Sequence, residues 1–357
     1  MSWVGQLDIF RLPSDVIIGL TDVYSYKGRQ VFHDEVIGSE IKLYIEQTMI
    51  QDIESFTTLL DLKVSPTRLA TLARKEMSPR NNAEKTVLKF KQVLTNIMEK
   101  HQSFAFSTNE IQAFHSVVFE HIANTRFART ETTSKFATQK VINKRLELDE
   151  VLETADLVYR GHKYEKLVLS LLLFVDFYNI KAFQEKNEYT ALMLLQLLLF
   201  KIGFDNFKYV SFYEYINENF EEYKKALVAA SFSYEEGLSQ PLPLIRFFLR
   251  ALVETSKTIA QMVKNHEYDQ QLNKSYSLEN TVYKLPQVFQ KEDLRRIHPG
   301  VSDSTINRAL VRLREEGVVR PLGKGRSAKW MRIQNKDKFN IQEQISLDMI
   351  IEDKNAK

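Results

Sequence analysis

Apolar residues recur at helical spacing along most of the chain. They form one-sided patterns in residues 39–60 and 83–100, where spacings of three and four positions put them on one helix face. Two denser apolar runs occupy residues 167–175 and 191–200. Both are shorter than the roughly 18 residues that a membrane-spanning helix needs. We therefore expect buried helices of a soluble protein and no membrane segment.

Start and stop signals divide this pattern into helices. Pro66 suits the first turn of a helix with Ser65 as its cap, and Ser107 with Glu110 forms a capping-box pattern. Gly203 suits a helix end. Further helices are predicted for residues 147–157, 163–180, from near 189 to 203, 212–219 running on toward 231, and 242–264. The basic, poorly periodic segment 126–145 predicts a loop or short hairpin, so the fold class is mainly α.

The amino-acid composition and the N-terminal sequence indicate the cellular compartment in which the protein works. The 357 residues include no cysteine, which removes disulfides, cysteine nucleophiles and thiolate metal sites. The N-terminus lacks a basic segment followed by a long apolar stretch, so a signal peptide is not expected. These features fit a cytoplasmic protein.

Shifts in polarity predict the domain organisation. Residues 266–286 become polar and less periodic, as in a linker. We expect a helical N-terminal region (1–82), a helical core domain (83–265), this linker, a C-terminal module (287–333) and a tail (334–357).

The C-terminal module concentrates positive charge. Residues 287–333 hold 11 Lys and Arg against 5 Asp and Glu, or 11 − 5 = +6; the remainder holds 49 − 11 = 38 against 46 − 5 = 41, or −3. A short helix, a Pro-Gly turn, a second helix that buries Ile306, Leu310 and Leu313, and a strand–glycine turn–strand follow in order. This pattern resembles bacterial winged helix-turn-helix modules.

The resemblance implies a DNA-binding surface. The start of the second helix would face bases or phosphates, and the turn between the strands would follow the backbone. The residues so implied are Ser304, Thr305, Asn307, Arg308, Lys324 and Arg326. The alternative is a protein–protein module whose basic residues are simply solvated.

The core domain resembles the Fic (filamentation induced by cAMP) domain. The likeness rests on Pro79–Glu84, on the helix Ser107–His115, and above all on the order and spacing of elements in Leu172–Ala229. Most members of that family transfer AMP from ATP to a hydroxyl side chain of a target protein. The resemblance therefore implies a helical Fic-like core followed by a winged helix.

The family's active-site loop reads His-Pro-Phe-x-(Asp/Glu)-Gly-Asn-Gly-Arg-x-x-Arg. In this chain Phe183, Glu185 and Asn187 are retained, whereas other positions differ. The family's histidine, two glycines and two arginines are replaced, in that order, by Lys181, Lys186, Glu188, Tyr189 and Leu192.

These replacements remove each part of the usual chemistry. A lysine ammonium cannot serve as a general base near neutral pH. Side chains in place of glycine make a positive-φ phosphate nest costly, and Glu188 adds a negative charge where phosphates would lie. The two phosphate-clamping arginines are lost. We expect no catalytic residues, metal or cofactor; ATP and Mg²⁺ would bind only if an altered chemistry remains.

The retained residues also have structural interpretations. Phe183 suits a core anchor, Glu185 a partner for Lys181 or Lys186, and Asn187 a helix cap. His115 lies among apolar residues and suits a satisfied core histidine. The inhibitory helix of many relatives is matched only loosely by residues 56–61, with Leu60 at its glutamate position.

Three functions are consistent with these observations. The first is a catalytically degenerate Fic-like regulator that acts by binding, through DNA contacts of its winged helix. The second is an active nucleotidyl or related transferase that uses Lys181, Glu185 and Asn187 in an altered site. The third is an interaction scaffold for protein partners, and family analogy makes a homodimer plausible.

Overall fold

The computed structural model describes residues 2–75, 77–132, 140–271, 274–299, 301–323 and 328–333. The chain divides into two compact units, Met1–Met262 and Val263–Lys357. The division falls inside one long helix, α12 (Leu242–Gln271). The mainly α fold class expected from periodicity is confirmed. The expected tail 334–357 lies outside the described residues.

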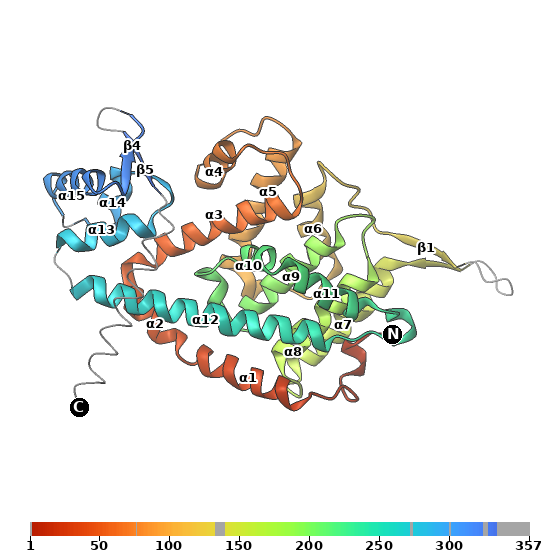
Figure 1. Cartoon of the computed structure of the whole chain (residues 1–357). Coiled ribbons are helices and arrows are strands. Elements are labelled where there is room, and N and C mark those ends of the chain that lie inside the picture. Colours follow the sequence, from red (N-terminus) through yellow and green to blue (C-terminus); the bar gives the residue numbers. More distant parts are fainter. Residues whose placement is uncertain are drawn as a thin grey trace, which may run out of the picture. The chain divides into compact units, whose positions relative to one another are not determined.

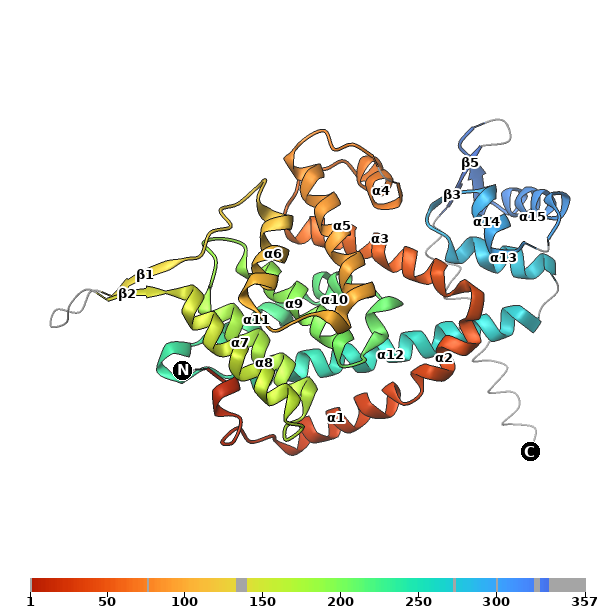
Figure 2. The ribbon, with the colours of Figure 1, turned by 180° about the vertical axis from the view of Figure 1, so that it is seen from behind.

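The first unit is built of helices joined by short turns (Figures 1 and 2). Besides α12, they are α1 (Ser14–Lys27), α2 (Gln30–Ile37), α3 (Ile41–Leu59), α4 (Pro66–Arg74), α5 (Asn82–Lys100), α6 (Thr108–Phe119), α7 (Lys144–Arg160), α8 (Lys166–Ile180), α9 (Asn187–Lys201), α10 (Phe212–Glu218) and α11 (Phe220–Ser231).

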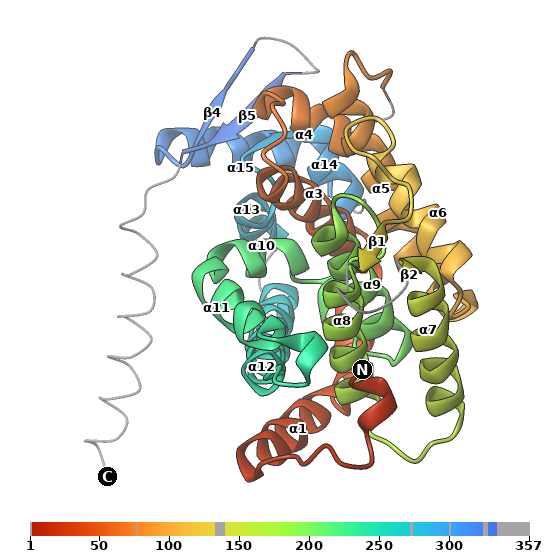
Figure 3. The same ribbon diagram turned by 90° about the vertical axis from the view of Figure 1, so that its right-hand side faces the viewer.

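Two adjacent helices, α8 and α9, form the centre of the first unit. All residues of α9 from Thr190 to Phe200 are buried, and α8 is buried over nearly its whole length. Helices α5, α6, α7 and α11 pack around this pair. Figure 3 shows α8 between α7 on one side and α11 with α12 on the other. The two apolar runs are therefore core helices, as their length and composition predicted.

A β-hairpin and one isolated bridge connect to this centre. Strands β1 (Arg129–Thr132) and β2 (Lys140–Asn143) pair antiparallel and extend away from the helices of the unit (Figure 2). Just before β1, Phe127 forms an isolated antiparallel bridge with Phe183 in the segment between α8 and α9. The hairpin expected in residues 126–145 is confirmed.

Helix boundaries agree with most of the start and stop signals. Ser107 Oγ accepts the Glu110 amide at 3.3 Å, but the Glu110 carboxylate binds the Ala105 amide and leaves the capping box incomplete. Ser65 occupies the cap position of α4 without a side-chain bond. Gly203 follows α9 with φ +79°, a conformation that glycine adopts without strain.

Two expectations about the chain's organisation need correction. The residues expected to form a polar linker, 266–286, contain the end of α12 and a further helix, α13 (Lys274–Lys284). Helix α13 was not predicted because its sequence is mostly polar. Only a narrow side of it, which includes Leu278 and Val282, is buried. The helix expected from residue 212 toward 231 is two helices, because the chain breaks at Asn219.

The second unit combines helices with a small sheet. After α13 come β3 (Val288–Gln290), α14 (Lys291–Ile297), α15 (Asp303–Glu315), β4 (Val319–Pro321) and β5 (Lys329–Arg332). The strands form an antiparallel sheet in the order β3-β5-β4. The three residues expected to be buried on α15, Ile306, Leu310 and Leu313, are at most 2% exposed. Gly317 follows α15 with φ +72°.

Among the described residues, no helix combines the length and the apolar character needed to cross a membrane.

Candidate functional site

The segment between α8 and α9 is a tight loop with two left-handed residues. Lys181, directly after α8, has φ +52°, and Lys186, directly before α9, has φ +59°. Residues with a Cβ avoid this region because the Cβ crowds the backbone. The loop therefore keeps a glycine-like backbone at position 186 although lysine occupies it. Glu188 lies inside the first turn of α9 and has ordinary helical geometry.

Phe183 fixes the middle of the loop to the core. Its ring is 1% exposed and stacks on His115 of α6 at 3.9 Å between ring centroids. Phe127 stacks on it at 5.1 Å. Backbone bonds from Ala128 N to Ala182 O (2.8 Å) and from Gln184 N to Arg126 O (3.0 Å) add a short strand-like pairing. The interpretation of Phe183 as a core anchor is confirmed.

Asn187 and Glu185 bind differently from what was expected. Asn187 does not cap α9: its Oδ1 accepts the Phe183 amide (2.9 Å) and its Nδ2 donates to the Phe183 carbonyl (2.7 Å). Glu185 Oε1 accepts the Asn124 amide at 3.2 Å. Within the described part of the chain it pairs with neither Lys181 nor Lys186. Both retained polar residues therefore hold the loop closed through backbone groups.

Glu188 forms the one ion pair of the loop among the described residues. Lys224 Nζ of α11 lies 2.9 Å from both carboxylate oxygens. A carboxylate in the first turn complements the positive end of the α9 dipole. Burial raises the pKa of Tyr178 and of Tyr189, and the Glu188 charge adds to both shifts. Glu188 thus supplies the negative charge at the position where this helix start would attract an anion.

Tyr189 and Leu192 are built into the core side of α9. The Tyr189 hydroxyl donates to the Leu59 carbonyl at the end of α3 (2.9 Å), and its ring meets Phe56 edge-on at 6.0 Å. Lys186 Nζ lies 5.6 Å from the Tyr189 ring centroid. Leu192 is 1% exposed. Residues 56–60 therefore contact the start of α9 through an aromatic ring and a backbone carbonyl.

His115 is neutral and mostly structural. Its Nδ1 pairs with Thr190 Oγ1 at 2.7 Å, whereas its buried Nε2 has no hydrogen-bond partner in the described residues. Burial lowers the pKa of His115 to about 4, so the imidazole is uncharged at pH 7. We expected both ring nitrogens of this core histidine to be hydrogen-bonded, and among the described residues only Nδ1 has a partner.

The chain resembles known proteins in its structure and not in its sequence. No family model and no curated protein matches the sequence. Solved structures do match: a Fic family protein from Desulfovibrio desulfuricans G20 superposes with TM-score 0.54 and 13% identity over 91% of this chain and 98% of that chain. A Fic domain containing signaling protein from Bacteroides thetaiotaomicron VPI-5482 gives 0.55 and 12% over 68% and 98%. Fic-1 from C. elegans gives 0.50 and 14% over 70% and 72%.

This chain has the Fic fold. The resemblance inferred from the order of elements is thereby confirmed at the level of architecture. Identities of 12–15% carry the fold and nothing finer. The loop between α8 and α9 contains the residues that the sequence comparison set against the family's catalytic loop, and its side chains make the contacts described above.

Of the six residues expected to bind DNA, the structure describes the four on α15 and does not describe the two in the turn between the strands. Ser304, Asn307 and Arg308 are exposed and Thr305 is half-buried at the start of α15. Ser302 Oγ contacts the hydroxyls of Ser304 and Thr305 at 2.8 and 2.9 Å. The side chains of Asn307 and Arg308 form no hydrogen bond or ion pair with the described residues. Lys324 and Arg326 lie outside the described residues.

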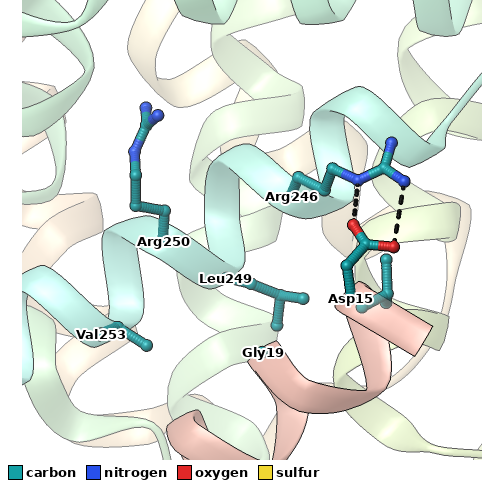
Figure 4. A pocket seen from close by; sticks show the side chains of 7 residues that line it. Asp15, Gly19, Arg246, Leu249, Arg250 and Val253 are labelled. Carbon is teal, nitrogen blue, oxygen red and sulfur yellow. Dashed lines mark hydrogen bonds and ion pairs between the residues drawn. The ribbon is translucent and has the colours of Figure 1, made fainter. Parts of the chain in front are cut away.

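A groove between α1 and α12 offers no second site for an anion. It encloses about 240 Å³ and is lined in part by Asp15, Gly19, Arg246 and Arg250. Arg246 Nε lies 2.6 Å from Asp15, and Arg250 Nη1 lies 2.6 Å from a glutamate of α11. Figure 4 shows the two guanidinium groups directed away from each other. The arginines therefore fasten helices instead of converging on a ligand.

Two residues that contact the loop and the start of α9, Asn124 and Lys224, were missed in the sequence. The Asn124 backbone amide donates to the Glu185 carboxylate, the Asn124 side-chain amide donates to Gln184 Oε1, and Lys224 pairs with Glu188. These partners lie 61 and 36 positions away, respectively. No local pattern marks them. Among the described residues, no group of three or more His, Asp or Glu could hold a metal ion.

Proposed function

We propose that this protein is a Fic-fold regulator that lacks AMP-transfer activity and acts by binding DNA through its C-terminal unit. The observation that carries the DNA part is the exposed first half of α15, where the side chains of Asn307 and Arg308 form no hydrogen bond or ion pair with the described residues, in a strongly basic segment. The order helix, strand, two helices and two strands, with an antiparallel sheet β3-β5-β4, supports interpreting this unit as a winged helix.

The loop contacts argue against magnesium and a nucleoside triphosphate as ligands. Glu185, the retained acidic residue, is exposed and accepts a backbone amide. Glu188, tied to Lys224, keeps a carboxylate at the start of α9 that would repel phosphates. Leu192, at the position of the family's second arginine, is buried and carries no charge that could hold a phosphate. The residues present do not fit the group that the fold implies, and we derive no transfer step.

Nucleotide binding can be measured directly. Calorimetry of the full chain with ATP and Mg²⁺, and with other nucleotides, is expected to give no heat of binding. Labelled ATP is expected to leave no label on a mixture of candidate target proteins. Saturable binding would favour the alternative of a transferase with Lys181, Glu185 and Asn187 in an altered site.

DNA binding can be tested with matched variants of α15. Mobility shift with a pool of genomic fragments is expected to show salt-dependent binding by the full chain. Arg308→Ala removes an exposed charge in the first half of α15 and should weaken specific binding by about 1–3 kcal/mol. Arg314→Ala removes an equal charge at the other end of α15 and should have a much smaller effect. Equal effects, or binding that is absent or insensitive to salt, would contradict the DNA assignment.

A further inference from the structure

The three-stranded sheet β3-β5-β4 of the second unit has one side packed on helices and one open side. Phe289 and Trp330 lie opposite each other in the register and are buried, at 2% and 7% exposure. Arg332, two positions after Trp330, lies on the same side, and its guanidinium donates to the Tyr283 carbonyl of α13. Because side chains alternate between the two sides of a strand, the residues in between point to the open side.

The open side is apolar and basic. Met331 lies opposite Arg320 in the register, and alternation adds Ile333, Leu322 and Lys329 to the same side. Backbone bonds of the Leu322 and Ile333 amides continue the pairing to both of these residues. Leu322 is 48% and Ile333 is 42% exposed, Met331 is half-buried, and both basic residues are exposed. Large apolar side chains gathered on one face in this way mark a docking surface.

The chain continues from this face into a segment of opposite charge. After Ile333 come 357 − 333 = 24 residues, which lie outside the described residues. Within them, residues 339–353 hold four acidic and no basic residues, whereas residues 287–333 have a net charge of +6. Seven of these fifteen residues are large and apolar: Phe339, Ile341, Ile345, Leu347, Met349, Ile350 and Ile351. The segment therefore complements the open side in both charge and polarity.

We propose that residues 339–351 cover the open side of the sheet in the same chain. The five polar residues between them and Ile333 span up to about 17 Å when extended. The two outer strands of a three-stranded sheet are only about 10 Å apart, so the segment can reach the whole face. Its apolar side chains would pack on Met331, Leu322 and Ile333, and its carboxylates would lie near the two basic residues. A nucleic acid would use the basic residues and leave the apolar ones in water, so it fits this face less well.

The proposal does not depend on DNA binding. Helix α15 packs against α13 and α14, on the helix side of the sheet. Its exposed residues, among them Asn307, therefore lie away from the open side. A segment that covers the open side leaves the start of α15 accessible.

Hydrogen exchange of the full chain tests whether the segment is covered. The amides of residues 339–351 are expected to exchange at least about tenfold more slowly than in a free peptide of the same sequence. Leu322→Glu places a carboxylate beside the acidic segment and should remove this protection. Val311→Glu is the matched control, because Val311 is 40% exposed on α15 of the same unit, and it should leave the protection unchanged. Protection of α15 in the same data shows that each variant remains folded.

Two results of this experiment would overturn the proposal. The first is exchange at the free-peptide rate in the natural chain, which would mean that the segment does not dock on its own sheet. The second is an equal loss of protection in Leu322→Glu and Val311→Glu, which would place the segment elsewhere.

The lack of cysteine in the chain permits a direct test of contact. Met331→Cys, combined in turn with Ile341→Cys, Ile345→Cys or Met349→Cys, is expected to form a disulfide within one chain for at least one pair under mild oxidation. Peptide masses after digestion identify the bond. Asn307→Cys with the same three partners is the control and should stay largely reduced. Equal oxidation of both sets would contradict docking on the open side, and disulfides between two chains would assign the segment to a second copy instead.

Discussion

Lysine at position 186 carries a backbone conformation that suits glycine. Its φ of +59° sits directly before α9, and the loop on both sides is fixed by Asn187 and Phe183. The left-handed region costs an ordinary residue about 1–2 kcal/mol. The surrounding contacts therefore hold a strained residue in place.

Lys186→Gly should stabilise the protein. Relief of strain in the folded state outweighs the extra freedom of glycine in the unfolded chain, and we expect a net gain of about 0.5–1 kcal/mol. Urea unfolding measures the change. Gln184→Gly is the control, because Gln184 has no positive φ; it should lose stability. A loss for Lys186→Gly would mean that the lysine side chain contributes more than its strain costs.

Asp52 of α3 is a second residue under strain, because its surroundings disfavour the charged form that an aspartate usually has at neutral pH. Its carboxylate is fully buried and accepts Ser211 Oγ at 2.6 Å and the Tyr213 amide at 3.3 Å. Burial outweighs these bonds and raises the pKa of Asp52 to about 7. The folded state therefore binds a proton that the unfolded state releases near pH 4.

This difference predicts an unusual pH dependence. Because the folded state holds more protons than the unfolded state between about pH 4 and pH 7, the free energy of unfolding should fall as pH rises through that range. Burial also raises the pKa of Asp176, to about 6, which adds to the same trend. In Asp52→Asn the Asp52 part should vanish. Urea unfolding at a series of pH values checks this, and parallel curves for the two proteins would contradict it.

At the scale of elements, the loop is held by α3, α6, α11 and the segment just before β1. Their contacts with the loop and the first turn of α9 include the Leu59 carbonyl with Tyr189, His115 with Phe183, Lys224 with Glu188, and Phe127 with Phe183. These contacts make the loop part of the helical core. The loop contains no glycine, and these neighbours hold its two residues with positive φ in place.

Phe183→Ala should show how much the fold depends on this loop. Removing a fully buried aromatic ring that stacks on two others is expected to cost about 3–5 kcal/mol. Thermal or urea unfolding gives the value. Gln184→Ala, one position along and exposed, should stay within about 0.5 kcal/mol of the natural protein. A small effect of Phe183→Ala would mean that the loop is not a structural anchor.

Sequence patterns predicted the elements better than their contacts. The two apolar runs correctly predicted α8 and α9, and the spacing of Ile306, Leu310 and Leu313 correctly predicted the buried face of α15. The polar helix α13 and the break at Asn219 were missed, because the local pattern of each is weak. The partners of Glu185 and Glu188 were also missed. They depend on packing between helices that are distant along the chain, which periodicity does not record.

At the scale of the whole molecule, charge is divided unevenly along the chain. The net of +6 in residues 287–333 stands against −3 in the remainder. Such a division favours nonspecific attraction of polyanions to the second unit.

Retention on heparin should separate this attraction from sequence recognition. Arg308→Ala and Arg314→Ala each remove one exposed charge from α15, so both should elute at similarly lower salt. Only Arg308→Ala should impair binding to a preferred DNA fragment. If heparin distinguishes the two variants as strongly as DNA does, the difference lies in folding or local potential and not in base recognition.

The burial of Leu192 limits which substitutions the start of α9 can accept. An arginine at this position would place a guanidinium in a site that is now 1% exposed, at a cost of several kcal/mol unless a partner appeared with it. Placing glycine at position 186, where φ is already positive, would be easy by comparison. Leu192→Arg alone is therefore expected to destabilise the protein, so an anion clamp could be built here only together with a partner for the new charge.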